Sequence, residues 1–483
     1  MRGGSVHPWF TVGVLLAALT GSCLVQPAAS ASGWTEPVTV SAAHDSIDSI
    51  ALAAGTRGEM VLWHADDLLP DGQVFGPSEA AFATASGEGQ FGGEHPLQSS
   101  FATGALVNLG PMWGSGRVAQ LTFRRTGLST SEPAVALGGV DGRFAPPLRV
   151  HAAVWAGRAS LAGDAQGDLL LAWISSTRSG RRQVWVSVRH SGHPFQAPRL
   201  VSSTADAEQV TAAMGEGLHS MSAKGFDADM AVAFASKTGR MLVSVRLHGQ
   251  GWGSVQDVGQ AAVGTVNGVA VAFGRSSRVV VAWYRQQLSE GGPLGPGVTQ
   301  VAVRPPDRHG FLPPQTLERD ANASLTGTPS LVVNNGRGFL LAYVAQPGPL
   351  VHGSVSSIVR VSYSKGNRFA PPQTVSPAGQ QVSGVVAAEA PDGDIVSWSG
   401  GPNQPLTTLS PGAAIFAAVT DPRTGRLGAP AQVGPAEYAE LATPIYAPYG
   451  QRWLLAWRGR QGTPPQSALG RVVVRVSSCV SQC

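Results

Sequence analysis

The chain has 483 residues, of which 43% are hydrophobic and only 13% are charged, with a formal net charge of +4. This length exceeds the ~250 to 300 residues at which a single hydrophobic core stops growing, so several domains or a modular array are required. The basic residues are spread along the whole sequence, which argues against a nucleic-acid-binding protein, because such proteins gather them on one face or in one run.

The N-terminus has the pattern of a secretory signal peptide. Arg2 precedes an apolar stretch from Trp9 to Leu19, and residues 29–31 (Ala-Ser-Ala) form a small-residue cleavage site. We therefore predict a signal peptide over residues 1–31 and a secreted protein. The alternative is a lipoprotein signal, with Cys23 as the lipid-anchored residue. No later apolar run approaches the ~18 to 20 residues that a membrane-spanning helix needs, so we expect no transmembrane segment.

The stretch from Ser160 to Ser202 reads as one structural repeat. A Gly-containing turn at Asp164 to Asp168 leads into a continuous apolar run, Leu169 to Trp173. An alternating strand follows at Val184 to Arg189, and a short strand at Arg199 to Ser202 closes the unit. Gly and Pro are frequent, at 61 and 35 residues, and apolar residues form short runs between turns. Both features are typical of an all-β protein.

Degenerate copies of this unit fill nearly all of the chain. Eight apolar strands end at an aromatic residue, at intervals of about 56 residues. The aromatic residues are Trp63, Phe123, Trp173, Phe234, Trp283, Tyr343, Trp398 and Trp457. A period in this range with about four short strands per unit is typical of a β-propeller. We predict a propeller of eight four-stranded blades over residues 32–476, with one aromatic side chain buried at each blade interface.

The two ends of the chain complement each other. The last repeat has a third strand, Arg471 to Val476, but no fourth strand. Residues Trp34 to Ser41 match the fourth strands of other repeats, such as Phe195 to Ser202 and Phe369 to Ser376. We expect this N-terminal strand to complete the last blade, which leaves no free sheet edge.

The C-terminal tail, residues 477–483, contains Cys479 and Cys483. In an oxidising compartment two cysteines this close are expected to form a small disulfide loop. The alternative is a pair of free thiols on the tail. The 11 histidines are scattered, and no metal-ligand or nucleotide-binding spacing occurs, so we expect no metal and no cofactor.

The turn between third and fourth strands carries a motif-like pattern. Residues Ser362 to Phe369 fit the frame S-x-D-x-G-x-x-W, with Ser364 in the Asp position. The Gly-x-x-aromatic half recurs at Gly192 to Phe195 and at Gly249 to Trp252. The chain thereby resembles the sialidase-like propellers that carry Asp boxes, over essentially all of its predicted mature length, although no repeat keeps the Asp.

The resemblance implies an alternative in which the protein is an enzyme. Sialidase-like enzymes use three arginines, a Tyr/Glu pair and an Asp at the propeller axis, with an early F-R-I-P signature. Here Phe123 and Arg124 share only the first two letters of that signature. Candidate Tyr and Glu neighbours are Glu437, Tyr438, Glu440 and Tyr446. Because fold does not carry function, the catalytic residues remain unassigned.

A ligand is expected on the face that carries the loops between second and third strands, because these loops are long in several repeats. Repeats two to four place seven basic residues there: Arg124, Arg125, Arg178, Arg181, Arg182, Lys237 and Arg240. Arginine forks suit carboxylate or phosphate groups, which points to an anionic glycan or cell-wall polymer. The alternative is that these residues only keep the face hydrated.

Three functions remain open at this point. The first is a secreted non-catalytic binding module for an extracellular glycan, a cell-wall polymer or a protein. The second is a sialidase-like glycoside hydrolase or lyase with its site on the central axis. The third is a structural or interaction propeller without a small ligand.

Overall fold

The computed structural model describes residues 33–44, 46–66, 79–86, 90–97, 102–109, 116–125, 131–150, 156–164, 166–177, 179–202, 206–215, 228–259, 264–274, 277–286, 296–320, 328–334, 338–347, 356–391, 393–402, 413–421, 424–434, 440–447, 451–460 and 470–477. The predicted signal peptide, Cys23, Arg178 and the predicted disulfide between Cys479 and Cys483 lie outside these residues and remain predictions. No helix in the described parts of the chain has the length and apolar character needed to cross a membrane.

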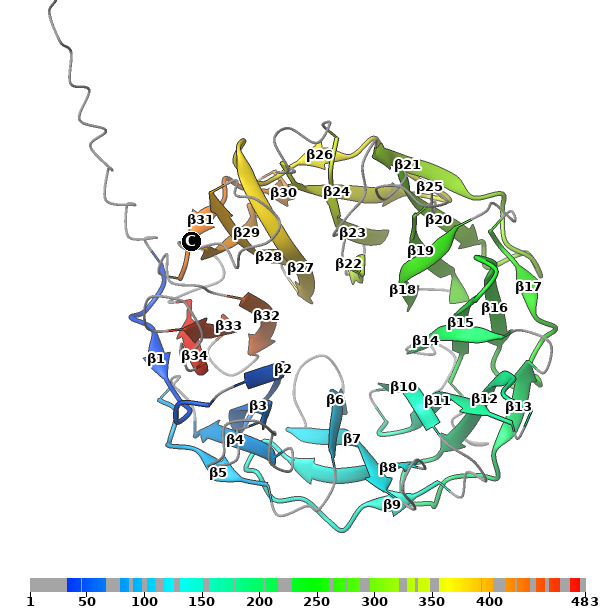
Figure 1. The fold of residues 1–483 in the computed structure, drawn as a ribbon, viewed down its shortest axis with the longest axis horizontal. Coiled ribbons are helices and arrows are strands. Elements are labelled where there is room, and N and C mark those ends of the chain that lie inside the picture. Colours follow the sequence, from blue (N-terminus) through cyan, green and yellow to red (C-terminus); the bar gives the residue numbers. More distant parts are fainter. Residues whose placement is uncertain are drawn as a thin grey trace, which may run out of the picture.

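Eight small antiparallel sheets stand around a central axis and form an eight-bladed β-propeller (Figure 1). The predicted fold class and blade count are therefore confirmed. We number the blades from 1 to 8 in the order of their inner strands. These are β2 (Ser46–Gly55), β6 (Ala102–Leu109), β10 (Ala156–Gly163), β14 (Ala207–Met214), β18 (Thr265–Phe273), β22 (Ser330–Asn334), β27 (Gln380–Ala390) and β32 (Glu440–Ala447).

The second strands carry the repeated aromatic residues. They are β3 (Gly58–Asp66), β7 (Arg117–Arg125), β11 (Leu169–Ser176), β15 (Met230–Ser236), β19 (Val279–Gln286), β23 (Gly338–Ala345), β28 (Gly393–Pro402) and β33 (Arg452–Arg460). Seven of the eight aromatics are at most 2% exposed, and Phe123 is partly buried. Trp173, for example, packs with Leu121 and Val135 of the preceding blade. Each interface between blades therefore has its own apolar core, as predicted.

The third and fourth strands complete the blades. The third strands are β4 (Glu79–Ala85), β8 (Ser131–Gly139), β12 (Arg182–Arg189), β16 (Met241–Arg246), β20 (Gly297–Arg304), β24 (Ile358–Lys365), β29 (Ala414–Asp421) and β34 (Gly470–Val476). The outer strands are β5 (His95–Pro96), β9 (Leu148–Arg149), β13 (Arg199–Ser202), β17 (Gln256–Asp257), β21 (Gln315–Asp320), β26 (Gln373–Thr374), β31 (Ala431–Gln432) and β1 (Val38–Thr39). Two short strands, β25 (Arg368–Phe369) and β30 (Arg426–Leu427), extend the turns of blades 6 and 7.

The Asp-box frame is present as backbone geometry. In blade 6 the Ser of the frame, and in blades 3 and 4 a Ser one position before the frame, donates its hydroxyl to the carbonyl oxygen of the residue after the aromatic. These bonds are Ser187 to Gln196 (2.6 Å), Ser244 to Gly253 (3.0 Å) and Ser362 to Ala370 (2.5 Å). At the Asp position, Ser364 Oγ instead accepts a hydrogen bond from the backbone N–H of Phe339 at 2.7 Å. The frame therefore holds the turn between third and fourth strands even though its Asp is missing.

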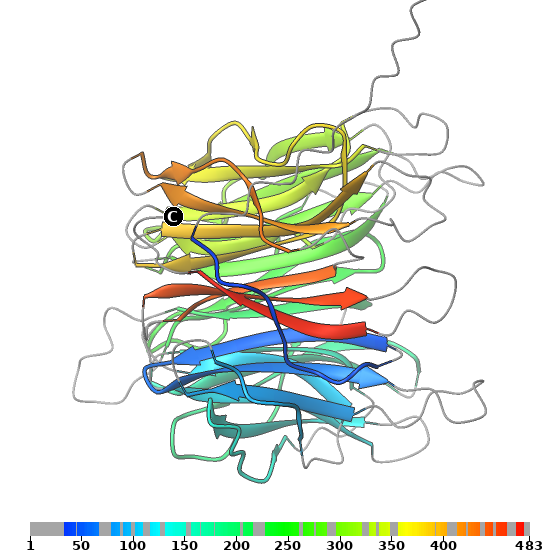
Figure 2. The same ribbon diagram turned by 90° about the vertical axis from the view of Figure 1, so that its left-hand side faces the viewer.

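The N-terminal strand closes the ring, as predicted. In β1, Val38 and Thr39 pair with Val474 and Val473 of β34, and Figure 2 shows the blue N-terminal strand beside the red β34. Trp34 bridges to Ser477 just as Phe195 bridges to Arg189 in blade 3. Blade 8 is thus built from both ends of the chain.

The strands cross the disc from one face to the other (Figure 2). Because each sheet is an antiparallel meander, the connections from second to third strand and from blade to blade share one face, which we call the long-loop face. The turns from first to second and from third to fourth strand share the opposite face, which we call the turn face. The long connections identified in the sequence all join a second strand to a third strand, so they belong to the long-loop face.

Candidate functional site

The inner strands share a β-bulge near the long-loop face. In five blades the inner strand has one extra residue at an equivalent position. On the neighbouring second strand, this position lies opposite the gap between the first and second residues after the repeated aromatic. The extra residues are Asp48, Gly157, Glu208, Asn267 and Ser383. The partner strand lies on the outer side of each inner strand, so the bulges lie in the strands nearest the axis. The inner strands surround the axis (Figure 1), and we call these five positions on them the axial ring.

The axial ring presents hydrogen-bonding groups of several kinds. The side chains of Asn267 and Ser383 are exposed, and that of Glu208 is half-buried. Arg158, which follows the bulge of blade 3, is exposed and donates from Nη1 to the Glu208 carbonyl oxygen at 2.8 Å. Asn267 donates from Nδ2 to Gln286 Oε1 at 2.8 Å. The ring therefore offers donors and acceptors held by rigid strands, which is what a polar ligand needs.

Two of the inner strands that carry these bulges contain several small side chains. The inner strands β10 and β14 have the sequences AGRASLAG and AEQVTAAM.

The predicted basic residues lie on the long-loop face of two neighbouring blades. Arg181 and Arg182 lie in and beside the β11–β12 hairpin of blade 3, and Lys237 and Arg240 in the β15–β16 hairpin of blade 4. All four are exposed. The backbone N–H of Lys237 donates to the Asp206 carbonyl oxygen at 2.8 Å, so the two hairpins lie close to the same connection.

Carboxylates accompany two of these arginines. Arg182 Nη1 lies 3.9 Å from Glu208 Oε1, and Arg240 Nε lies 2.8 Å from Asp257 Oδ2. Glu208 comes from the inner strand β14 and Asp257 from the outer strand β17, so a count of charges over the hairpins alone misses both. Arg124 and Arg125 are the last residues of β7, but their side chains are outside the description, as is all of Arg178.

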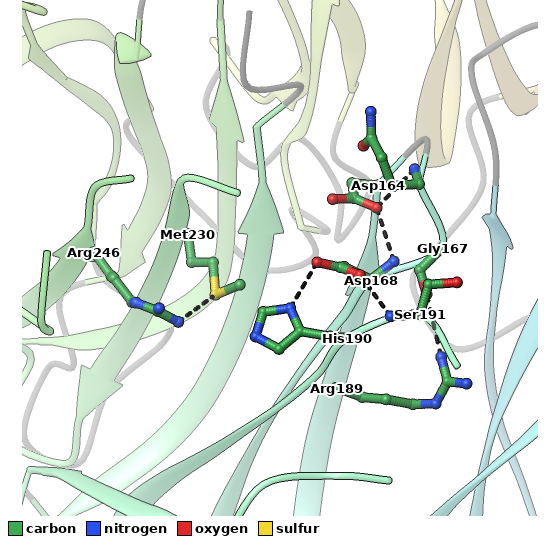
Figure 3. A network of polar contacts seen from close by, with 9 residues as sticks. Asp164, Gly167, Asp168, Arg189, His190, Ser191, Met230 and Arg246 are labelled. Atoms are coloured by element: carbon green, nitrogen blue, oxygen red, sulfur yellow. Dashed lines mark hydrogen bonds and ion pairs between the residues drawn. The ribbon is translucent and has the colours of Figure 1, made fainter. Parts of the chain in front are cut away.

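A second polar network lies on the turn face of blade 3 (Figure 3). Asp168 accepts a hydrogen bond from the Ser191 backbone N–H at 2.7 Å, and its other oxygen lies 2.9 Å from His190 Nδ1. Asp164 Oδ1 accepts from the Asp168 N–H at 2.9 Å. Burial raises the pKa of Asp164 to about 6. An Asp paired with a His can orient a general base, so this network is a second candidate site.

The neighbouring blade repeats the arrangement with different side chains. Asp229 takes the place of Asp168 and accepts hydrogen bonds from the His248 N–H, at 2.7 Å, and from the Ser277 hydroxyl. The recurrence indicates that the Asp ties the two turns of the blade together. We therefore assign the turn-face network to the stability of the fold.

A buried polar cluster lies between blades 5 and 6. Glu318 Oε2 and Arg360 Nε are 3.2 Å apart, and Asp320 Oδ1 accepts from the Gln346 N–H at 2.9 Å. Asp320 is 1% exposed and burial raises its pKa to about 6; burial likewise raises the pKa of the Tyr343 hydroxyl. These contacts join the two blades, so we assign the cluster, like the turn-face network, to the stability of the fold.

Of the enzyme candidates from the sequence, only Tyr446 has a described side chain, and it is buried. Tyr446 is 7% exposed and packs edge-on against Trp453, with ring centroids 5.6 Å apart. Glu440 begins β32, but its side chain is not described, and Glu437 and Tyr438 lie outside the described residues. Among the described residues, no group of three or more His, Cys, Asp and Glu side chains is arranged to hold a metal ion.

No protein family matches the sequence, and no curated protein is similar to it. Solved structures with a similar fold include a polysaccharide lyase of the PL25 family, an ulvan lyase bound to a saccharide of GlcA and Rha3S. It is 11% identical, the match covers 75% of this chain and 93% of that chain, and the TM-score is 0.48. An α-L-arabinofuranosidase from Fusarium graminearum is 14% identical over 66% of this chain and 92% of that chain, with a TM-score of 0.35.

The hemagglutinin-neuraminidase ectodomain of parainfluenza virus 5 is 8% identical over 67% of this chain and 80% of that chain, with a TM-score of 0.32. At these values the similarity concerns the propeller architecture alone. Function must be argued from the residues of this chain.

The axial ring was not identified from the sequence. Its signal is a polar or glycine residue that interrupts a weakly apolar strand, as in SIDSI, AGRAS, VNGVA and VSGVV, which surround Asp48, Gly157, Asn267 and Ser383. One such interruption is uninformative. Its recurrence at the same distance from the next aromatic could have revealed the ring.

Proposed function

We propose that the protein is an exported, non-catalytic β-propeller that binds an extracellular glycan at the axial ring. The observation that carries the proposal is the set of five bulges at one height on the inner strands, at Asp48, Gly157, Glu208, Asn267 and Ser383. Amide, hydroxyl and carboxylate groups are suited to the alternating donors and acceptors of sugar hydroxyl groups. Export follows from the predicted signal peptide over residues 1–31.

The described side chains of the ring support binding over hydrolysis. Most glycoside hydrolases need two carboxyl groups that flank the scissile bond, about 5 to 9.5 Å apart. Among the bulged residues whose side chains are described, only Glu208 is an acid, and its backbone and side chain are engaged by Arg158 and Arg182. A single carboxylate held in this way is a hydrogen-bonding group for a ligand.

The test is a glycan array followed by titration calorimetry with the best-bound oligosaccharide. The variant Asn267→Ala/Ser383→Ala should bind at least about tenfold more weakly, since each lost hydrogen bond costs ~1 kcal/mol. Asn367→Ala, an exposed Asn on the turn face, is the matched control and should bind as wild type does. Equal binding by wild type and the double variant would overturn the axial ring as the site. Release of reducing ends or unsaturated products would overturn the non-catalytic assignment.

A further inference from the structure

Arg285 is a buried cation with two unpaired nitrogen atoms. It is 7% exposed and lies next to the end of β19, on the side that faces blade 4. Neither Nε nor Nη2 has a hydrogen-bond partner in the described structure. Burial lowers the pKa of Arg285, while Asp257 favours the charged form. A guanidinium keeps its charge in proteins, so a buried one without partners is costly.

The propeller does not need an arginine at this position. Arg285 is the second residue after the repeated aromatic, and six of the eight blades have a small residue there. These residues are Ala65, Ser175, Ser236, Ala345, Gly400 and Gly459. Arg125 and Arg285 are the two exceptions. A position that breaks the repeat pattern at a cost to stability points to function.

Arg285 lies on the strand next to the inner strand of blade 5, which carries one bulge of the axial ring. Arg285 pairs across the sheet with Val266, the residue before the bulged Asn267. The Val266 carbonyl oxygen accepts a hydrogen bond from Gln209 Nε2 at 3.0 Å, and Asn267 is bonded to Gln286. The strand that carries Arg285 is therefore paired with the strand that carries the blade 5 bulge.

On its outer side Arg285 faces Gly259 and Asp257. A Cβ atom on Gly259 would lie 3.1 Å from Arg285 Nη2, so the glycine makes room for the guanidinium. The Gly259 N–H donates to Asp257 Oδ1, and Asp257 Oδ2 pairs with Arg240. We call this group the blade 4/5 seam: Gln209, Arg240, Asp257, Asn267, Arg285 and Gln286. Its two guanidinium groups and one carboxylate leave one net positive charge.

We propose that the blade 4/5 seam binds an acidic substituent of the glycan, a carboxylate or a sulfate, with Arg285 as its anchor. The inference rests on the proposed function, because it assumes a glycan at the axial ring. The guanidinium has two unused N–H directions, and its planar fork fits a carboxylate or sulfate group through paired hydrogen bonds. A neutral glycan would leave these two N–H groups without an anionic acceptor, so the seam selects for acidic glycans.

The decisive variant is Arg285→Ser, which introduces the residue that blades 3 and 4 already have at this position. Titration calorimetry would compare tetragalacturonate, its methyl ester and a sulfated oligosaccharide of the same length. Wild type should bind an acidic ligand about tenfold or more tightly than the neutral ester, and Arg285→Ser should lose that preference. Tighter binding of tetragalacturonate would identify the acidic substituent as a carboxylate, and tighter binding of the sulfated oligosaccharide would identify it as a sulfate. The control variant Arg308→Ser, at an exposed arginine on the turn face of the same blade, should keep the preference for the acidic ligand.

Thermal unfolding supplies a readout that does not depend on glycan binding. Arg285→Ser should raise the Tm, because an unpaired buried charge is removed, and sodium sulfate should raise the Tm of wild type more than that of the variant. Sodium chloride at equal ionic strength controls for screening, since sulfate also stabilises proteins generally. The same sulfate response in both proteins, together with an unchanged ligand preference, would overturn the seam.

The two proposals can fail separately. Equal binding of acidic and neutral glycans by wild type and Arg285→Ser would overturn the seam and leave the glycan function intact. A sulfate response that depends on Arg285 in a protein that binds no glycan would overturn the glycan function and leave an anion site at Arg285.

Discussion

Arg452 of blade 8 donates two hydrogen bonds to a single carboxylate oxygen of Glu59 in blade 1, from Nε at 3.1 Å and from Nη2 at 2.6 Å. The two residues are 393 positions apart in the sequence. Glu59 is fully buried and the Arg452 side chain is 11% exposed. Burial raises the pKa of Glu59, and Arg452 acts in the opposite direction. The pair therefore fastens the first blade to the last one at the turn face.

Removal of one partner should weaken this connection strongly. Arg452→Met leaves Glu59 buried without a counter-charge, which costs ~3 to 5 kcal/mol of unfolding free energy. The double variant Glu59→Gln/Arg452→Met contains no buried charge and should lose less than the single variant. Urea unfolding of wild type, both single variants and the double variant measures the coupling. A coupling energy near zero would show that the pair does not stabilise the ring.

The outer three strands of each blade could be predicted from the sequence. Trp173 and its counterparts end apolar strands that are covered on both faces, so they stand out at a regular interval. Closure by Trp34 to Ser41 could also be predicted, because that segment matches fourth strands such as β13. Both features are visible within short stretches of the sequence, as large apolar residues beside turns that contain Gly and Pro.

The inner strands and the site could not be predicted in the same way. The inner strand β10, AGRASLAG, consists mainly of Ala, Gly and Ser, and β14, AEQVTAAM, mixes Ala with polar residues. Neither has the run of β-branched and aromatic residues that marks a strand. The axial ring and the blade 4/5 seam join residues from different blades, and Arg285 looks like any surface arginine until its burial is known.

Deletion of the N-terminal strand should open the ring. Without Trp34 to Ser41, the backbone of β34 loses its pairing with β1 and becomes an exposed edge. We expect aggregation or a loss of cooperative unfolding, measured by size-exclusion chromatography and calorimetry. Deletion of the predicted signal peptide alone, residues 1–31, is the control. A truncated protein that stays monomeric with an unchanged Tm would contradict closure through β1.

Each blade interface should depend on its aromatic anchor. Trp173 is 1% exposed and packs against the apolar residues of blade 2. Trp173→Ala should lower the unfolding free energy by ~3 to 5 kcal/mol through the cavity it creates. Leu200→Ala, at a residue that is 37% exposed on the outer strand of the same blade, should change it by less than ~0.5 kcal/mol. Similar losses in both variants, measured by urea unfolding, would contradict the assigned packing.

Stability should fall as pH rises through the titration of Asp320. Burial raises its pKa from 3.8 to about 6, so between these values the folded protein holds a proton that the unfolded chain has released. The unfolding free energy therefore decreases across this window, by up to ~3 kcal/mol for a shift of this size. The contribution is fully present below pH 4 and is lost above pH 6. Asp164, whose pKa is also raised to about 6, adds to the same decrease.

Asp320→Asn should remove its share of this pH dependence. The amide keeps an oxygen that can accept the hydrogen bond from the Gln346 N–H but cannot ionise. We therefore expect the variant to be more stable than wild type at pH 8 and to approach it near pH 4, in urea unfolding at intervals of one pH unit. Asp307→Asn, at an exposed carboxylate in the same blade, should follow the wild-type curve throughout. If the Asp320→Asn and wild-type curves run parallel over the whole range, Asp320 does not titrate as a buried acid. The cluster between blades 5 and 6 would then have to hold that carboxylate ionised, with the Arg360 guanidinium as its counter-charge.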